Sequence, residues 1–157
     1  MTSQLKTLIT AAFFLTAATA TSAEGLGAHP PMFLTQAEYA LEAGDTARAI
    51  DLLNKRYKRL PAPADRIRGY AVMCRAFLAE DNLKRAAWAC NRATEMDLAD
   101  WSDFNNRGVL ELHLGEFAAA LASFERAQTL NPKSEPVRNN LLRTRSIIDQ
   151  ELISSAN

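Results

Sequence analysis

The fold of this chain is decided by the stretch Asn105 to Pro132, N-N-R-G-V-L-E-L-H-L-G-E-F-A-A-A-L-A-S-F-E-R-A-Q-T-L-N-P. It holds two apolar patterns, each spaced by three or four residues, with a glycine step at Gly115 between them. The first pattern, which begins just upstream, is Phe104, Gly108 and Leu112, and the second is Ala120, Phe124, Ala127 and Leu130. Such spacing places each set on one face of a helix, and Pro132 ends the second helix. The stretch predicts an αα-hairpin whose apolar faces are too large for the hairpin alone to bury.

These residues resemble a tetratricopeptide repeat (TPR), a helical hairpin with a period of 34 residues. With Trp101 as position 1, seven residues fall on the family positions 4, 8, 15, 20, 24, 27 and 32: Phe104, Gly108, Gly115, Ala120, Phe124, Ala127 and Pro132. The one clear departure is Glu111, which stands at position 11, where the family usually has an aromatic residue.

The same period indicates two earlier repeats. One step back begins at Ile67 and has its turn at Asp81-Asn82, with Leu98 in place of the usual proline. Its matches to the family positions are Tyr70, Cys74, Phe77, Ala86, Cys90 and Ala93. Aligning Gly44 with position 15 starts a further repeat at Pro30 and leaves 64–66 as an insertion behind a stiff Pro-Ala-Pro connection. Asp65 and Asp100 are the expected N-caps of the helices that follow them.

The C-terminal region predicts one more helix, at about 135–153, capped by Ser134 and carrying an apolar stripe. A stack of helical repeats needs such a helix to cover its last apolar face. We therefore expect an all-α TPR-like α-solenoid of seven helices, an αα-hairpin repeat superhelix, over residues 33–153. Its repeats are expected at about 30–63, 67–100 and 101–134, and its capping helix at about 135–153.

The first 23 residues have the plan of a cleavable secretory signal. Lys6 is the only charge before Glu24, an apolar and threonine-rich run follows it, and small residues close the segment at 18–23. The run is too short to cross a bilayer as an ordinary helix, although an uncleaved anchor is the alternative. Residues 24–32 are expected to be a flexible lead, since paired prolines and glycines resist regular structure. We expect a periplasmic or secreted protein with no membrane insertion after signal cleavage.

Two cysteines, Cys74 and Cys90, flank the expected turn symmetrically, each eight residues from Asn82. In an antiparallel hairpin they lie at the same height on the inward faces, and an exported chain meets an oxidising environment. We predict a Cys74–Cys90 disulfide. The alternatives are two buried reduced cysteines or a redox-active dithiol, although the C-x-x-C spacing of the latter is absent.

Composition and motifs argue against an enzyme. Lys plus Arg number 18 and so do Asp plus Glu, so net charge gives no reason to expect a nucleic-acid or anionic-membrane partner. The sequence contains no zinc-protease, nucleophile-elbow, P-loop or haem-attachment motif. His113 stands on a helix, where a histidine is more often solvated than catalytic. We expect no cofactor and no metal site.

The resemblance implies binding instead. In TPR proteins the first helix of each pair lines a concave groove, at positions near 2, 5, 9, 12 and 13 of the repeat. Carried over, the groove-facing residues are Leu34, Glu38, Leu41, Glu42, Arg68, Ala71, Arg75, Leu78, Ser102, Asn105, Val109, Leu112 and His113, with Asn139 and Arg143 from the capping helix. The peptide-binding set that we select is Glu38, Arg68, Arg75, Ser102, Asn105, Val109, His113 and Arg143. Each of these residues also has the alternative of being a solvated helix residue.

One TPR subtype holds a C-terminal carboxylate with lysine, asparagine and arginine at fixed groove positions. In this sequence those positions are occupied by Leu34, Glu38, Val72, Ser102 and Asn106. That clamp is therefore not expected. Trp88 lies away from the inward face of its helix and is expected to pack on a neighbouring repeat or on the convex side.

Two functions remain after the sequence analysis. The first is an exported, non-enzymatic adaptor that binds a peptide or protein segment in its groove. The second is an oligomerising scaffold of an envelope complex, a possible homo-oligomer that uses the convex face near Trp88 or the capping helix.

Overall fold

The computed structural model describes residues 30–60 and 62–155, and these residues form seven α-helices and one short 3-10 turn, η1, with no strand among them. The elements are α1 (Met32–Glu42), α2 (Thr46–Asn54), η1 (Tyr57–Arg59), α3 (Pro63–Ala79), α4 (Leu83–Thr94), α5 (Trp101–His113), α6 (Phe117–Leu130) and α7 (Glu135–Ser155). The all-α fold and the seven predicted helices are confirmed. The expected signal segment, residues 1–23, and residues 24–29 of the expected lead lie outside the described residues.

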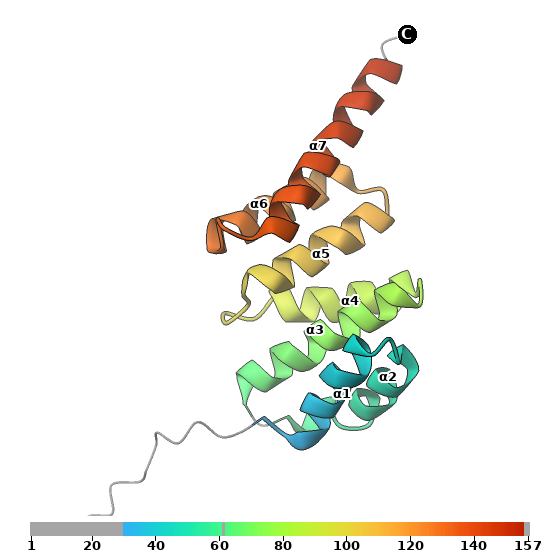
Figure 1. Ribbon diagram of the computed structural model, residues 1–157, viewed down its shortest axis with the longest axis vertical. Coiled ribbons are helices and arrows are strands. Elements are labelled where there is room, and N and C mark those ends of the chain that lie inside the picture. Colours follow the sequence, from blue (N-terminus) through green and yellow to red (C-terminus); the bar gives the residue numbers. More distant parts are fainter. Residues whose placement is uncertain (1–29, 61, 156–157) are drawn as a thin grey trace, which may run out of the picture.

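The helices form three antiparallel pairs that stack in chain order along the long axis of the molecule (Figure 1). α1 packs on α2, α3 on α4 and α5 on α6, while α7 packs on α6 at the C-terminal end. The first helices of successive pairs, α1, α3 and α5, also touch one another, and α7 continues that layer against α5. The layer of first helices is the wall on which the site is built.

One turn geometry joins the two helices of every pair. A residue with positive φ stands at each turn: Gly44 (80°), Asp81 (52°) and Gly115 (75°). The backbone N–H one residue further on then donates to a carbonyl five residues back, at 2.8 Å in all three turns. Glycine adopts this conformation without strain, and aspartate is one of the few other residues that tolerate it. Asp81 and Gly115 are 34 residues apart, which equals the period counted from Trp101, and Gly44 precedes Asp81 by three residues more than that period.

The core consists of two apolar clusters. The larger one spans the first two pairs, where Leu34, Leu53 and Phe77 are fully buried, and reaches α5 through Leu110. The smaller one joins the third pair to α7 through Phe124, Val137 and neighbouring residues. Because α7 covers the second cluster, it acts as the expected cap; it extends two residues beyond the predicted end.

The predicted disulfide is present between α3 and α4. Cys74 and Cys90 are buried, with an S–S distance of 2.05 Å and Cα atoms 4.9 Å apart. That Cα separation lies within the range that a disulfide requires.

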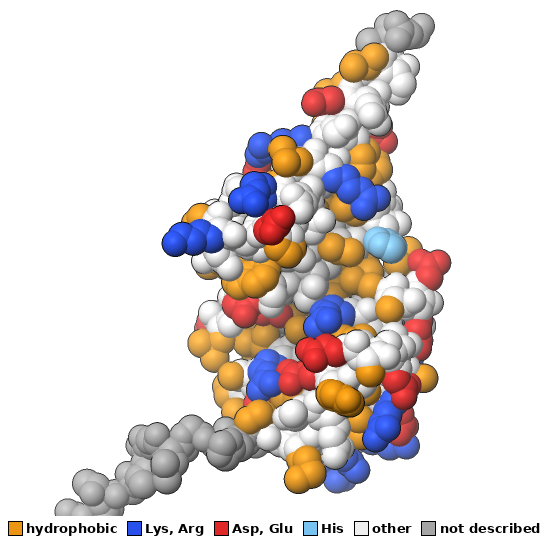
Figure 2. Space-filling model, in the orientation of Figure 1, with side chains coloured by type: hydrophobic (Ala, Val, Ile, Leu, Met, Phe, Trp, Pro, Cys, Tyr) orange, Lys and Arg blue, Asp and Glu red, His pale blue; other side chains and the backbone are white. Residues whose placement is uncertain are grey.

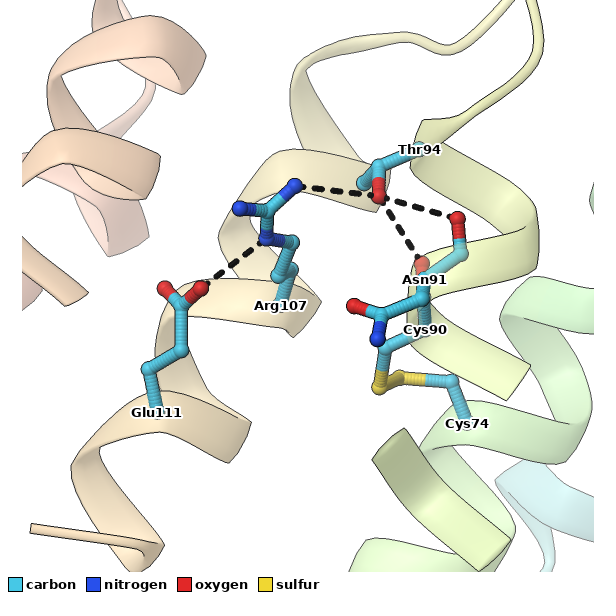
Figure 3. A network of polar contacts seen from close by, with 6 residues as sticks. All are labelled: Cys74, Cys90, Asn91, Thr94, Arg107 and Glu111. Carbon is cyan, nitrogen blue, oxygen red and sulfur yellow. Dashed lines mark hydrogen bonds and ion pairs between the residues drawn. A yellow bond between two sulfur atoms is a disulfide. The ribbon is translucent and has the colours of Figure 1, made fainter. Parts of the chain in front are cut away.

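A polar network joins the second pair to the third (Figure 3). The Thr94 hydroxyl, on α4, lies 3.1 Å from the backbone carbonyl of Cys90 and accepts a 3.5 Å hydrogen bond from Arg107 of α5. The Arg107 Nε in turn donates to Oε1 of Glu111 at 2.9 Å. Glu111 is only 6% exposed, and its Oε2 has no hydrogen-bond partner in the described part of the chain. The departure at position 11 therefore places a half-satisfied carboxylate in the interior.

Two local predictions, both of helix caps, were wrong. α3 begins at Pro63 with Ala62 as its N-cap, so the three inserted residues, 64–66, lie in the first turn of α3. Asp65 consequently lies inside the helix, because proline at the first helical position is already set in a helical φ. Ser134 does not cap α7 through its side chain, since its buried hydroxyl has no hydrogen-bond partner among residues 30–60 and 62–155. Asp100, by contrast, is the N-cap that was predicted for α5.

Trp88 packs at the junction of the first two pairs. Its ring lies 5.5 Å from the ring of Tyr57 and 5.5 Å from that of Tyr70, both in edge-on geometry. Tyr57 comes from η1 and Tyr70 from α3, so the indole joins two repeats, as predicted, while remaining 39% exposed.

Candidate functional site

The layer of first helices encloses a groove of about 660 Å³. Its walls come from α1, α3, the loop before α5 and the first half of α5, and Pro136 at the start of α7 closes one end. Five residues of the predicted peptide-binding set line this groove: Glu38, Arg68, Arg75, Ser102 and Asn105. In the face shown by Figure 2, acidic and basic side chains lie next to each other over α1 and α3, with apolar groups around them.

The side chains of Glu38 and Arg68 are paired with each other. Arg68 donates from Nε to Oε1 at 3.0 Å and from Nη2 to Oε2 at 2.7 Å, a bidentate pair that links α1 to α3. Such planar pairing fixes both side chains and cancels their charges. These two residues therefore hold the groove wall in place, and a ligand would have to compete with the pair to use either one.

Arg75 is the unengaged cation of the groove. It lies two turns further along α3 than Arg68, is exposed, and makes no hydrogen bond or ion pair with the described residues. Asn106 of α5 lines the same groove, and its side chain is likewise without a hydrogen bond to residues 30–60 or 62–155. Arg75 and Asn106 are thus available to donate to a bound main chain or an acidic side chain.

The start of α5 contributes a capping box. Asp100 Oδ1 accepts from the backbone N–H of Ser102 at 2.7 Å and from its hydroxyl at 2.6 Å, while Asp103 Oδ2 accepts from the Asp100 N–H at 2.9 Å. The pKa of Asp103 is raised from 3.8 to about 6, chiefly by burial; the hydrogen bond from the Asp100 backbone lowers it, and the nearby Asp100 charge raises it by less than burial does. Asp103 therefore has a pKa of about 6 at the wall of the groove.

The other three predicted residues, Val109, His113 and Arg143, lie together in a second hollow of about 390 Å³ between α5 and α7. Asn105 stands between the two hollows, because its side-chain oxygen accepts a 2.9 Å hydrogen bond from Asn140 of α7. Asn139 lines neither hollow. The predicted set is thus divided by the contact between α5 and α7.

Leu34 was expected to face the groove, and this was wrong. The side chain is 0% exposed and packs in the larger apolar cluster. Leu41 and Leu78 also pack against that cluster and do not line the groove. In each case the apolar side chain packs on the core, because its burial is more favourable than exposure in a polar groove.

Several groove residues were not selected from the sequence. Leu98, Asp100, Trp101, Asp103 and Pro136 come from the loop before α5 and from the starts of α5 and α7, and Ala64 and Ile67 come from α3. The Asp-x-x-Asp spacing at 100–103 is a capping signal that could have placed Asp103 at a helix start. The inter-repeat loop could not be placed by counting helix positions.

The described residues hold no group of three or more His, Cys, Asp or Glu side chains that could bind a metal ion. Within the same part of the chain, none of the helices has the length and apolarity needed to cross a membrane.

No protein-family model matches this chain, and no curated protein matches it. Solved structures do. The first TPR domain of the human RPAP3 protein superposes with a TM-score of 0.69 at 18% identity, covering 78% of this chain and 94% of that one. The second TPR domain of human RPAP3, in complex with the HSP70 peptide SGPTIEEVD, gives a TM-score of 0.63 at 20% identity, with coverages of 72% and 92%. At these identities the likeness establishes the fold: the chain has a TPR-like, all-α helical-repeat fold.

Proposed function

We propose that this chain is a non-enzymatic protein-interaction module that binds a peptide or protein segment in the groove formed by α1, α3 and α5. The observation that carries the proposal is the groove itself, about 660 Å³, built on the inner layer of a TPR-like fold. The second TPR domain of RPAP3 was solved with a nonapeptide bound, which supports peptide binding as the role of the fold here.

The groove surface suits a segment with both apolar and polar side chains. Ala71, Leu98 and Trp101 supply apolar wall, and Arg75 and Asn106 supply unengaged donors. Such a combination gives orientation through a few polar contacts and affinity through buried apolar area. The Glu38–Arg68 pair contributes by keeping α1 and α3 in register.

Site-specific photo-crosslinking tests the groove assignment. Peptides of twelve random residues are selected by display against residues 24–157, which contain all seven helices. A photoreactive residue then replaces Ala71 in the groove or, as a matched control, the exposed Ala122 on α6. Crosslinks of the selected peptides from position 71 and not from 122 support the proposal. Crosslinks from 122 alone, or from neither position, contradict it.

We also propose that the chain is exported and works in the periplasm or outside the cell. The signal-like segment 1–23 and the Cys74–Cys90 disulfide support this location together. The test is intact mass of the chain expressed with its own N-terminus and recovered from the periplasm. Cleavage near residues 20–24 and two cysteines that resist alkylation until reduced are expected. A full-length chain with two reactive thiols contradicts the proposal.

A scaffold that self-associates is the second candidate, and one observation favours α7 as its interface. α7 has 21 residues whereas α6, on which it packs, has 14, and α7 projects from the end of the stack (Figure 1). Leu142 and Leu152 are more than 60% exposed on this helix. Light scattering on the wild type and on Leu152→Glu decides: a dimer that Leu152→Glu converts to monomer supports the scaffold, and a wild-type monomer contradicts it.

A further inference from the structure

The charges that line the groove do not cancel. Four carboxyl groups face it, from Glu38, Glu42, Asp100 and Asp103, against the two guanidinium groups of Arg68 and Arg75. Because Glu38 and Arg68 neutralise each other in a bidentate pair, the remaining groups are three carboxyls and Arg75. A groove of this composition attracts cations and repels anions.

Asp103 is the second and independent observation. Its side chain lines the groove but is only 4% exposed, and just one of its oxygens, Oδ2, accepts a hydrogen bond. The other oxygen, Oδ1, accepts no hydrogen bond from residues 30–60 and 62–155 and keeps some exposure at the groove wall. No described lysine, arginine or histidine forms an ion pair with it, and α7 contributes only Pro136, which has no side-chain donor, to this end of the groove. An acceptor left open at the wall of the groove can take a hydrogen bond from a donor on a bound segment.

We propose that the segment bound in the groove carries a lysine or arginine side chain, whose cationic head contacts Asp103 and Asp100 at the start of α5. This inference rests on the function proposed above and specifies its ligand. The aliphatic stem of the basic residue would lie along Trp101 and Leu98, which line the same end of the groove. Arg75 and Asn106 would then donate hydrogen bonds to main-chain carbonyls or to an acidic residue elsewhere in the segment.

A metal ion is a poorer occupant of this position than an organic cation. The residues that the structure describes include no cluster of three or more metal-ligating side chains, and Asp103 itself offers one unused oxygen. An ammonium or guanidinium group needs only one or two such acceptors, and the apolar lining suits its carbon stem.

Proton linkage gives the proposal a distinctive signature. The charged groups facing the bound cation are Glu38 and Glu42 from α1, Arg68 and Arg75 from α3, and Asp100 beside Asp103. Since Asp103 has a pKa of about 6, below that pH the carboxyl must lose a proton before it can pair with the cation. Affinity for a basic peptide should therefore fall about 10-fold between pH 7.5 and pH 5 if binding requires the ionised form.

The test uses the twelve-residue peptides selected by display on residues 24–157, with the composition of the selected pool as the first readout. Lysine and arginine should be enriched over the input pool and over aspartate and glutamate. Fluorescence anisotropy then gives the Kd of the best peptide for the wild type, Asp103→Asn, Glu42→Gln and the control Asp149→Asn on exposed α7. Asp103→Asn should weaken binding about 10-fold and flatten its pH dependence, Glu42→Gln should weaken it about 3-fold, and the control should leave it unchanged.

Two failures are distinguishable. Peptides that crosslink from position 71 but are not enriched in basic residues, and that bind wild type, Asp103→Asn and Glu42→Gln equally, overturn the basic-ligand inference and leave the groove function intact. The absence of any crosslink from position 71 overturns both. Because Glu42 is exposed and takes no part in the capping box, its variant stays informative even where Asp103→Asn does not fold.

Discussion

The second and third helix pairs share one register but solve the same packing problem differently. At repeat positions 8 and 24, where the two helices of a pair come closest, α3–α4 has Cys74 and Cys90 joined by a disulfide. The pair α5–α6 has Gly108 and Phe124 instead, and a Cβ added to Gly108 would lie 2.6 Å from the Phe124 ring. In the second pair, two cysteines joined by a covalent bond fill the space between the helices. In the third pair, a glycine facing a phenylalanine fills the corresponding space.

The pairs differ again at positions 11 and 3. Phe77 fills position 11 of the second pair and is fully buried, whereas the third pair has Glu111, tied to Arg107 and with one oxygen unpartnered. At position 3 the second pair has Gly69, and the third has Asp103. The second pair is thus held by apolar packing and a covalent bond, and the third holds buried carboxyls, one of which faces the groove. This contrast teaches that the register fixes where side chains meet but not how they are stabilised.

The largest loss of stability is expected when the side chain at position 24 of the third pair, Phe124, is truncated. Phe124→Ala removes a fully buried ring against a glycine that cannot fill the space, so it should cost about 3–5 kcal/mol in unfolding free energy. Urea denaturation followed by circular dichroism measures it. The half-buried Phe117→Ala on the same helix is the control and should cost clearly less. Equal losses for the two variants would mean that Phe124 is not the key contact.

Loss of the disulfide of the second pair should lower the free energy of unfolding almost as much. The double variant Cys74→Ala, Cys90→Ala opens a loop with a sequence separation of 16 and should lower stability by about 3 kcal/mol through the entropy of the unfolded chain. Reduction of the wild type should reproduce most of this loss, and reduction of the double variant should change nothing. A double variant as stable as the oxidised wild type would show that packing alone holds α3 to α4.

Asp103 should give the third pair a pH dependence that Gly69 cannot give the second. The folded-state pKa of about 6 exceeds the ordinary 3.8, so this carboxyl stabilises the fold below pH 4 and that contribution is lost as pH rises through 6. Asp103→Asn removes the effect. Its stability relative to the wild type should rise by up to about 3 kcal/mol between pH 4 and pH 7. Urea unfolding of both proteins across that range measures it, and a constant difference would contradict the prediction.

Exchanging the packing solutions sharpens the comparison. Gly108→Ala should cost about 1–3 kcal/mol by overpacking against Phe124, in spite of the better helix propensity of alanine. Adding Phe124→Leu recreates the alanine–leucine pairing of Ala37 and Leu53 in the first pair. The double variant should therefore lose less than the sum of its single variants, which a double-mutant cycle in urea tests. Strict additivity would show that the two positions are not coupled.

The smallest effect is expected at position 11. Glu111→Met replaces the half-satisfied carboxylate with an apolar chain of similar length and leaves Arg107 able to reach solvent and Thr94. We expect stabilisation of about 1 kcal/mol or less, because the desolvation of the carboxylate is relieved. Thermal unfolding measures it. A loss greater than about 1 kcal/mol would show that the Arg107–Glu111 pair stabilises the junction of the second and third pairs.

The helices were predictable because local signals agree with the period. Gly44, Asp81 and Gly115 mark the turns, Asp100 marks a helix start, and the small residues at positions 8 and 20 mark the close contacts. The start of α3 was missed because counting back from Trp101 gives a repeat boundary, whereas the helix start depends on Pro63 and its neighbours. The pairing of Cys74 with Cys90 followed from their equal distance to the turn.

The site was predicted less completely. Counting positions along the first helices found Arg75 and Ser102, but it also placed Leu34 in the groove. It did not show that the contact between α5 and α7 divides the predicted residues between two hollows. Glu38 and Arg68 were named as groove residues, yet nothing in the sequence showed that they pair with each other across 30 positions. Pairing between distant residues depends on the orientation of each helix about its axis and on its distance from the neighbouring helix.

By itself the sequence determined the number of helices, their turns, the order in which they stack and the disulfide, because each of these depends on residues close in the chain or on the fixed period. Only the tertiary structure decided that Asp103 is buried with a free oxygen at the groove wall, that Arg68 is already engaged, and that Val109, His113 and Arg143 form a separate hollow. The physical reason is that burial and charge pairing are set by three helices at once, and no spacing within one helix encodes them.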